Sequence, residues 1–139
     1  MARRKKPREP EPQAAAEEEF QVVGFREADG SVPLLEWLDG LESPDAVLQC
    51  LGVLMLLKRH ANRLVRPHAD ALRDSIRELR ARVGRVQYRM FYFFHKRGAV
   101  VTHGCIKPGR ETPPREIDRA IAYRQRFLAD PVRHTYQEL

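Results

Sequence analysis

The stretch that decides the fold runs from Glu78 to Phe94 and reads ELRARVGRVQYRMFYFF. Apolar and charged residues alternate on both sides of Gly84, and the second half is rich in aromatic side chains. A period of two that is interrupted by glycine is typical of two antiparallel strands joined by a tight turn. Arginine recurs inside these strands, at Arg80, Arg82, Arg85 and Arg89. One face of the predicted sheet is therefore positively charged.

The net charge of the 139-residue chain is +6, and it is located in this part of the sequence. Ten basic and two acidic residues lie between Leu72 and Arg110, which gives +8, whereas the rest of the chain sums to −2. A basic patch confined to one part of a fold is the electrostatic footprint of a polyanion-binding protein. The alternative is a solvated basic face without a partner.

The sequence before this hairpin predicts one strand and a pair of helices. FQVVGFR, residues 20–26, is a β-branched and aromatic run that ends at the turn signal ADGS. Leucine then recurs at helical spacing, with Ser31 as the expected N-cap of the first helix. Ser43 followed by Pro44 favours the start of a second helix. We therefore expect a helical hairpin over residues 32–64.

A further strand and a last helix are expected after the hairpin. AVVTHGCIK, residues 99–107, predicts a strand, and three closely spaced strands favour an antiparallel meander. Thr112 is the expected cap of a final helix with Pro113 in its first turn. The predicted fold class is α+β, with an N-terminal strand, a helical hairpin, a curled antiparallel sheet and a C-terminal helix. The helices are expected behind the sheet, on the side away from the arginines.

The remaining segments bound the domain and the class of protein. We expect a disordered charged tail at residues 1–19, one domain at 20–130 and a C-terminal tail at 131–139. No signal peptide or membrane span is recognised, so a cytoplasmic protein without a membrane partner is expected. Cys50 and Cys105 lie in apolar runs, and no residues have the spacing of metal ligands. We expect neither a metal site nor a cofactor.

Four segments in order carry a resemblance to a known family. They are ELR at 78–80, YRMFYFF at 88–94, HGCIK at 103–107 and TPPREIDRA at 112–120. In order and spacing they resemble the RelE/ParE toxin superfamily, most closely its HigB-like, phage-derived branch. The resemblance covers residues 20–128. It departs at Cys105, where the branch usually has phenylalanine, and at Pro108 and Glu111, where lysine is common, so two positive charges are missing beside Lys107.

The resemblance implies the toxin of a type II toxin–antitoxin system. Such a protein is an mRNA interferase, an endoribonuclease that cuts mRNA on the ribosome by metal-independent acid–base chemistry. Its implied partners are mRNA, the ribosome and a cognate antitoxin of helix-turn-helix type in a hetero-oligomer. The catalytic candidates are Arg80, Arg89 and Lys107, which would hold the scissile phosphate, and His103, whose ordinary pKa of ~6.5 suits an acid or base. Further candidates for RNA binding are Arg82, Arg85, Lys96, Arg97 and Arg110.

Other interpretations of the same residues stay open. Arg80 has the alternative of a surface ion pair with Glu78 or Asp74, and a lone histidine such as His103 is commonly structural. Arg89 lies in an aromatic strand, so it either meets a carboxylate or faces an anion site. Two other functions also stay open, because fold alone does not fix activity. One is a ParE-like topoisomerase inhibitor, and the other is a non-catalytic module of the same fold that binds nucleic acid or protein.

Overall fold

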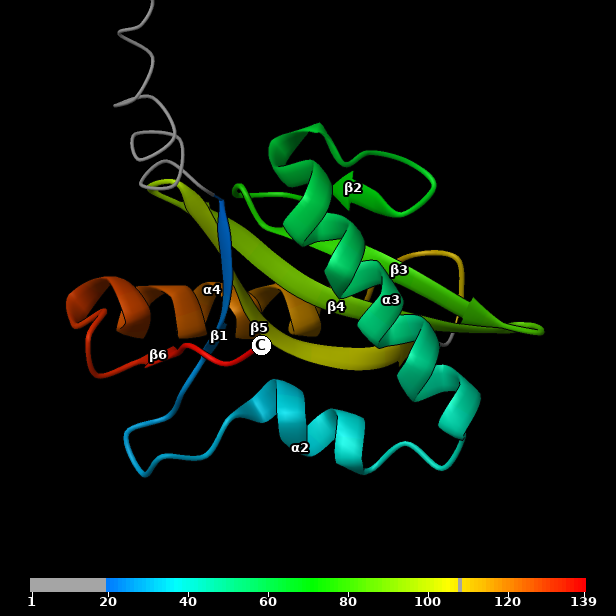
Figure 1. Ribbon diagram of the computed structural model, residues 1–139, viewed down its shortest axis with the longest axis horizontal. Coiled ribbons are helices and arrows are strands. Elements are labelled where there is room, and N and C mark those ends of the chain that lie inside the picture. Colours follow the sequence, from blue (N-terminus) through cyan, green and yellow to red (C-terminus); the bar gives the residue numbers. More distant parts are fainter. Residues whose placement is uncertain (1–19, 108) are drawn as a thin grey trace, which may run out of the picture.

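The structure is a computed structural model that describes residues 20–107 and 109–139, so the tail expected at 1–19 lies outside the described residues. A six-stranded sheet has helices on both faces (Figure 1). The elements in chain order are β1 (Gln21–Phe25), α2 (Pro33–Asp39), α3 (Pro44–His60), a 3-10 turn (Ala61–Arg63), β2 (Ala69–Ala71), β3 (Arg77–Val83), β4 (Val86–His95), β5 (Gly98–Lys107), α4 (Pro114–Ala129) and β6 (Thr135–Tyr136).

The centre of the sheet is the antiparallel meander β3-β4-β5. The turn between β3 and β4 contains Gly84 at a φ of +59°, a backbone conformation that glycine adopts without steric cost. Two features distinguish the sheet from a simple antiparallel meander. The pairing of β4 with β5 shifts register between Met90 and Tyr92, and β1 joins the free side of β5 in parallel. The predicted α+β class and meander are confirmed.

Two short strands that the sequence pattern did not predict lie at the two edges of the sheet. The strand order is β2-β3-β4-β5-β1-β6. β2 pairs with the first part of β3, and β6 pairs with the end of β1. Leu139 packs against the core cluster beside α3, and the amino group of Lys58 donates a hydrogen bond to its carbonyl oxygen. Residues in the segment 131–139 thus contact both the sheet and the core cluster.

The two faces of the sheet carry separate hydrophobic cores. Helices α2 and α3 cover one face, where Leu34, Leu54 and Leu57 pack on Leu79 and Met90. Helix α4 crosses the other face (Figure 1) and buries the following residues against Phe25, Phe91 and Phe93: Ile117, Ala120, Tyr123 and Phe127. The expectation of helices on one side only is wrong, because the arginine-bearing face also carries an aromatic half that α4 covers. Only the other half of that face is left for a polar site.

Local sequence explains where the helices begin. Ser43 caps α3 by accepting a hydrogen bond from the backbone N–H of Ala46 at 3.1 Å, as its position predicts. Ser31 does not cap α2, because Val32 holds the N-cap position and the Ser31 hydroxyl bonds to Asp29 instead. The first turns of both helices contain proline, which needs no hydrogen-bond acceptor there.

Gly104, the glycine of the HGCIK segment, fixes how α2 packs on the sheet. The indole ring of Trp37 lies over Gly104, so a Cβ atom built at this position would overlap the ring. The adjacent residue on β4, Met90, is fully buried in the same core. The motif glycine therefore has a packing role, because it allows the first helix of the hairpin to approach the sheet closely.

Candidate functional site

The candidate site lies on the half of the sheet face that α4 leaves uncovered. Adjacent strands bring its cations together, because Arg80 on β3 is directly opposite Arg89 on β4. On the next strand, Lys107 is directly opposite Gln87 of β4. The sheet register therefore places the three predicted phosphate-binding residues side by side. The alternation that the sequence predicted puts all three on one face.

Glu78 holds the two opposed arginines together. Its Oε2 atom accepts a hydrogen bond from Nε of Arg80 at 3.0 Å and lies 3.4 Å from Nε of Arg89. Its Oε1 atom accepts a hydrogen bond from the hydroxyl of Thr112 at 2.6 Å. Like charges directly opposite on paired strands destabilise a sheet, and a buried carboxylate between them offsets that repulsion. Only 1% of Glu78 is exposed, so we assign it a positioning role.

The ion pairs continue across the edge of the sheet. Nη2 of Arg80 donates to Oδ2 of Asp70 on β2 at 2.9 Å, and the same oxygen accepts from Arg66. The hydrogen bond from Arg66 is the main cause that lowers the pKa of Asp70. Asp74, an alternative partner predicted for Arg80, pairs with Arg73 instead. Arg80 thus has two carboxylate partners, which neutralise part of the charge available to an anion.

Arg89 is the most deeply buried cation of the site. Its Nη2 donates to Oε1 of Gln87 at 2.5 Å, and burial lowers the pKa of its guanidinium, with Glu78 acting in the opposite direction. Among the described residues, the buried Nε has no hydrogen-bond acceptor, although Glu78 lies within ion-pair distance. Buried donors without acceptors are uncommon in native proteins and often mark functional sites.

A shallow depression of about 340 Å³ opens beside Glu78 and Arg80, next to the start of α4. Its lining includes Glu78, Arg80, Lys107, Arg110 and Thr112. Among the described residues, Lys107 forms no ion pair, and burial and the nearby Arg89 lower the pKa of its amino group. The depression thus combines Arg80, which Glu78 and Asp70 hold in place, with one lysine that is available to a ligand. An arrangement of this kind can bind a phosphate group.

The other predicted RNA-binding residues lie in two separate places. Arg82 and Arg85 are at the β3–β4 turn, on the same end of the sheet as the depression, which Arg110 also lines. Lys96 and Arg97 form the turn at the opposite end of β4. A strand of ten residues separates the two turns by roughly 30 Å at about 3.3 Å per residue. One phosphate site cannot include both groups.

His103 lies beneath α4 rather than in the depression. It is 1% exposed and stacks on Phe91, and its ring nitrogens lie 3.0 Å from Thr102 Oγ1 and 2.9 Å from Glu116 Oε1. Burial lowers the pKa of His103 to about 4, against the hydrogen bond to Glu116, which raises it. A neutral imidazole with both nitrogens engaged is placed for packing. The predicted role as acid or base therefore has no support from this position.

Sequence reasoning missed two polar residues that shape the site. Thr112 was expected to cap the last helix, but Pro113 holds the N-cap position and the Thr112 hydroxyl binds Glu78 instead. Asp70 lies on the short strand β2, which has no alternating pattern of its own. The only signal for Thr112 was its place in the TPPREIDRA segment. In the part of the chain that the structure describes, no group of three or more His, Cys, Asp or Glu side chains is arranged to hold a metal ion.

The fold and the register define an α+β protein with a cationic cluster on the uncovered half of one sheet face. Residues 36–125 match the family model described as Phage derived protein Gp49-like (DUF891), so the chain belongs to that family. The family places the chain among the RelE/ParE-like toxins, a coarser assignment than the HigB-like branch that the motifs suggest. No curated protein matches the chain. No helix in the described residues has the length and apolar character to cross a membrane.

Proposed function

We propose that this chain is the toxin of a type II toxin–antitoxin system and acts as a ribosome-dependent mRNA endoribonuclease. The main supporting observation is that neighbouring strands of a Gp49-like protein place Arg80, Arg89 and Lys107 side by side, with Arg80 and Lys107 lining one depression. Neighbouring strands hold these cations in place, so little ordering is needed when a phosphate binds. The HigB-like branch is part of this proposal. A cytoplasmic location follows from the proposed substrate.

The proposed reaction uses the 2′-oxygen of the RNA as the nucleophile. This oxygen attacks the adjacent phosphorus and loses its proton, while the bond from phosphorus to the 5′-oxygen breaks and that oxygen gains a proton. Arg89 and Arg80 stabilise the negative charge that develops on the phosphate, and Glu78 holds both guanidinium groups in position. Lys107 lies at the rim and supplies a further charge close to the leaving oxygen. Burial and Arg89 lower the pKa of its amino group, which is the direction that proton transfer by a lysine requires.

The charge distribution supports the proposed partners. RNA and ribosome both present dense negative charge, which a basic surface attracts over several ångströms. An antitoxin that silences the protein has to cover or distort the depression, and acidic segments suit the positive charge there. We therefore propose a hetero-oligomer with a cognate antitoxin, of helix-turn-helix type as the resemblance implies.

One observation favours a second candidate, a non-catalytic binding module. Arg80 already has two carboxylate partners, and Glu111 replaces a lysine that is common in the resembling branch. The positive charge left for a substrate is smaller than the arginine count suggests. Such a module would bind RNA with steep salt dependence and leave it intact. The ParE-like alternative, inhibition of a topoisomerase, uses protein contacts rather than a phosphate site.

Induced expression in growing cells separates these functions. The interferase proposal predicts growth arrest with rapid loss of full-length mRNA. This loss should disappear in Lys107→Gln, which removes one half-buried charge without breaking an ion pair among the described residues. Induction of DNA damage with intact mRNA would contradict the proposal and favour topoisomerase inhibition. Growth without either effect, from a protein shown to be folded, would favour the binding module.

A further inference from the structure

One edge of the sheet is left open beside the candidate site. Strand β2 pairs only with Arg77, Glu78 and Leu79, and the carbonyl of His68 accepts the backbone N–H of Arg80 at 2.8 Å. In the described part of the chain, no strand lies beside the rest of β3. Backbone groups two residues apart point the same way, so the N–H and C=O of Arg82 face outward like the N–H of Arg80. Among the described residues, no backbone group pairs with the N–H and C=O of Arg82, so these two groups can pair with another strand.

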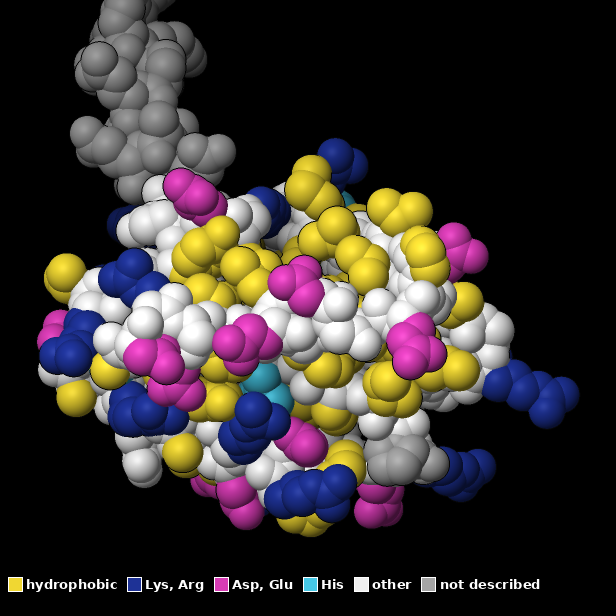
Figure 2. Space-filling model, turned by 90° about the horizontal axis from the view of Figure 1, so that it is seen from below, with side chains coloured by type: hydrophobic (Ala, Val, Ile, Leu, Met, Phe, Trp, Pro, Cys, Tyr) yellow, Lys and Arg dark blue, Asp and Glu magenta, His cyan; other side chains and the backbone are white. Residues whose placement is uncertain are grey.

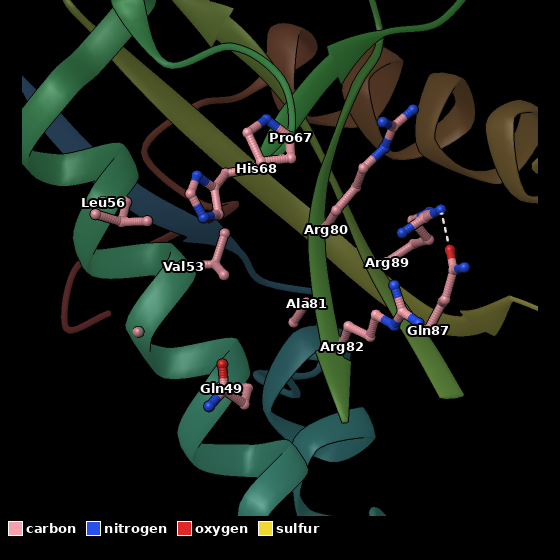
Figure 3. A pocket seen from close by; sticks show the side chains of 11 residues that line it. Gln49, Val53, Leu56, Pro67, His68, Arg80, Ala81, Arg82, Gln87 and Arg89 are labelled. Carbon is pink, nitrogen blue, oxygen red and sulfur yellow. Dashed lines mark hydrogen bonds between the residues drawn. The ribbon is translucent and has the colours of Figure 1, made fainter. Parts of the chain in front are cut away.

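A groove of about 590 Å³ runs along this open edge. One wall is α3, with Gly52, Val53 and Leu56. The residues from the sheet that line it include Ala81, Arg82 and Arg89. In Figure 3, Val53 and Ala81 point into the space between α3 and β3, whereas Arg80 and Arg89 point to the other side of β3. The groove therefore has an apolar side and a cationic side, separated by the strand edge.

Gly52 in the groove has no packing role within this chain. It lies in the middle of α3, where glycine costs roughly 1 kcal/mol relative to alanine. A Cβ atom built there meets no other atom within 4 Å, so nothing in the described chain requires the glycine. At a surface groove, a missing side chain allows another backbone to approach closely. Together with the open edge of β3, this glycine indicates that another polypeptide segment binds in the groove.

The apolar wall continues onto the outer surface of α3. Leu48 is 66% exposed and Met55 is 54% exposed, and Leu51 lies between them on the helix. Figure 2 shows hydrophobic side chains gathered in its upper part, where α3 lies. Leucine and methionine at this spacing form one stripe along the helix. Contiguous exposed apolar side chains next to a groove are typical of a protein interaction surface.

We propose that the open edge of β3 binds an extended segment of a partner protein in which apolar and acidic residues alternate. Such a segment would add a strand to the sheet by pairing with Arg82. Side chains alternate across a strand, so apolar residues would face Val53 and Leu56 while acidic ones face the arginines. Arg82 offers its charge, because among the described residues it bonds only to the carbonyl of Gly84. Naming the antitoxin as the source of this segment rests on the proposed function.

A second copy of this chain fits the edge less well than an acidic segment. Pairing two β3 edges would bring Arg82 and Arg85 of both copies together, and like charges on paired strands are destabilising. The surface therefore favours a partner of opposite charge. Sedimentation of the free protein checks this point, because concentration-dependent dimers that disappear in Arg82→Pro would overturn the assignment to an acidic partner.

Two synthetic peptides test the proposal on the purified chain without ribosomes. One alternates valine and glutamate, and the matched control alternates valine and lysine. At up to about 1 mM, the acidic peptide should shift the amide resonances of Gly52, Val53 and Arg82 and protect the Arg82 amide from hydrogen exchange. The basic peptide should bind at least about tenfold more weakly. Equal binding of both peptides, or none by the acidic one, would overturn the proposal.

Variants of Arg82 and Gly52 distinguish the contribution of the strand's backbone to peptide binding from that of the arginine charge. Arg82→Ala keeps the outward N–H and should weaken peptide binding severalfold, whereas Arg82→Pro removes that N–H and should abolish binding. Gly52→Tyr should block the groove while leaving the remaining resonances in place, because its Cβ has open space. Unchanged binding to Gly52→Tyr would contradict the assigned groove. If the protein cuts mRNA but does not bind the acidic peptide, this inference is wrong and the proposed function stands. If it binds the peptide but does not cut mRNA, the proposed function is wrong and this inference stands.

Discussion

Arg80 and Arg89 lie directly opposite each other on β3 and β4, and one buried carboxylate, that of Glu78, contacts both. This relationship sets the electrostatics of the site. Without Glu78 the two guanidinium groups would repel each other across paired strands. With it, the pair becomes a fixed cationic unit. Stability and the proposed phosphate binding would therefore depend on the same three residues.

Replacing Glu78 tests the positioning role. Glu78→Gln keeps the size of the side chain and an acceptor for Thr112 but removes the charge between the arginines. Breaking a buried ion pair in this way should lower the free energy of unfolding by about 3 kcal/mol, measured by urea denaturation. The control Glu111→Gln changes an exposed carboxylate at the same depression and should change stability by less than about 0.5 kcal/mol. Equal stability of the two variants would contradict the role.

The same substitution at two glycines should have opposite effects. Gly104→Ala places a methyl group against the Trp37 ring and should destabilise the protein by roughly 1–3 kcal/mol through overpacking. Gly52→Ala meets open space in the middle of a helix and should stabilise it by up to about 1 kcal/mol. Urea denaturation of both variants measures the difference. A loss of stability at Gly52 would mean that the helix needs this glycine for folding.

The buried histidine predicts how stability depends on pH. The pKa of His103 is about 4 in the folded protein, below the ordinary value of 6.5. As pH falls from 6.5 toward 4, the unfolded chain takes up a proton that the folded chain does not, so the free energy of unfolding decreases. The other titrating groups are common to wild type and His103→Gln. The stability difference between these two proteins, from thermal unfolding across this range, should therefore shrink on acidification, and a constant difference would argue against a neutral His103.

RNA affinity should depend on Lys107 and not on Lys96. Both are lysines near the end of a strand, but only Lys107 lines the depression. If it neutralises one phosphate of a single strand, Lys107→Gln should reduce the slope of log affinity against log salt by about 0.7. Lys96→Gln should leave the slope unchanged. Fluorescence anisotropy with a labelled oligonucleotide measures both, and equal losses would indicate a diffuse basic surface in place of one site.

The sequence predicted what depends on periodicity and charge. Alternation around Gly84 placed Arg80 and Arg89 on one face, and the run of aromatic residues marked a central strand. The helical hairpin followed from leucine spacing and the cap at Ser43. These features are local, so neighbouring residues carry the signal for them.

Long-range contacts could not be predicted in this way. β2 and β6 are too short to show a period, and their partners lie far along the chain. Thr112 has the chemistry of a helix cap, and only the folded sheet brings Glu78 within its reach. His103 belongs to a segment that resembles a functional motif, yet its side chain lies beneath α4. There its ring contacts Glu116 of that helix. Whether a polar side chain is buried or available to a ligand depends on which helix covers its face of the sheet.

Primer extension on a defined mRNA, incubated with the purified protein with and without translating ribosomes, tests the central claim most directly. Wild type, Arg89→Lys, Lys107→Gln and the control Lys96→Gln are compared after their folds are checked by circular dichroism. The account predicts ribosome-dependent cuts by wild type and Lys96→Gln, and losses of at least about 100-fold for Arg89→Lys, which lacks the planar fork of arginine. Intact mRNA in every lane, or cuts that persist in both site variants, would contradict the proposed endoribonuclease site.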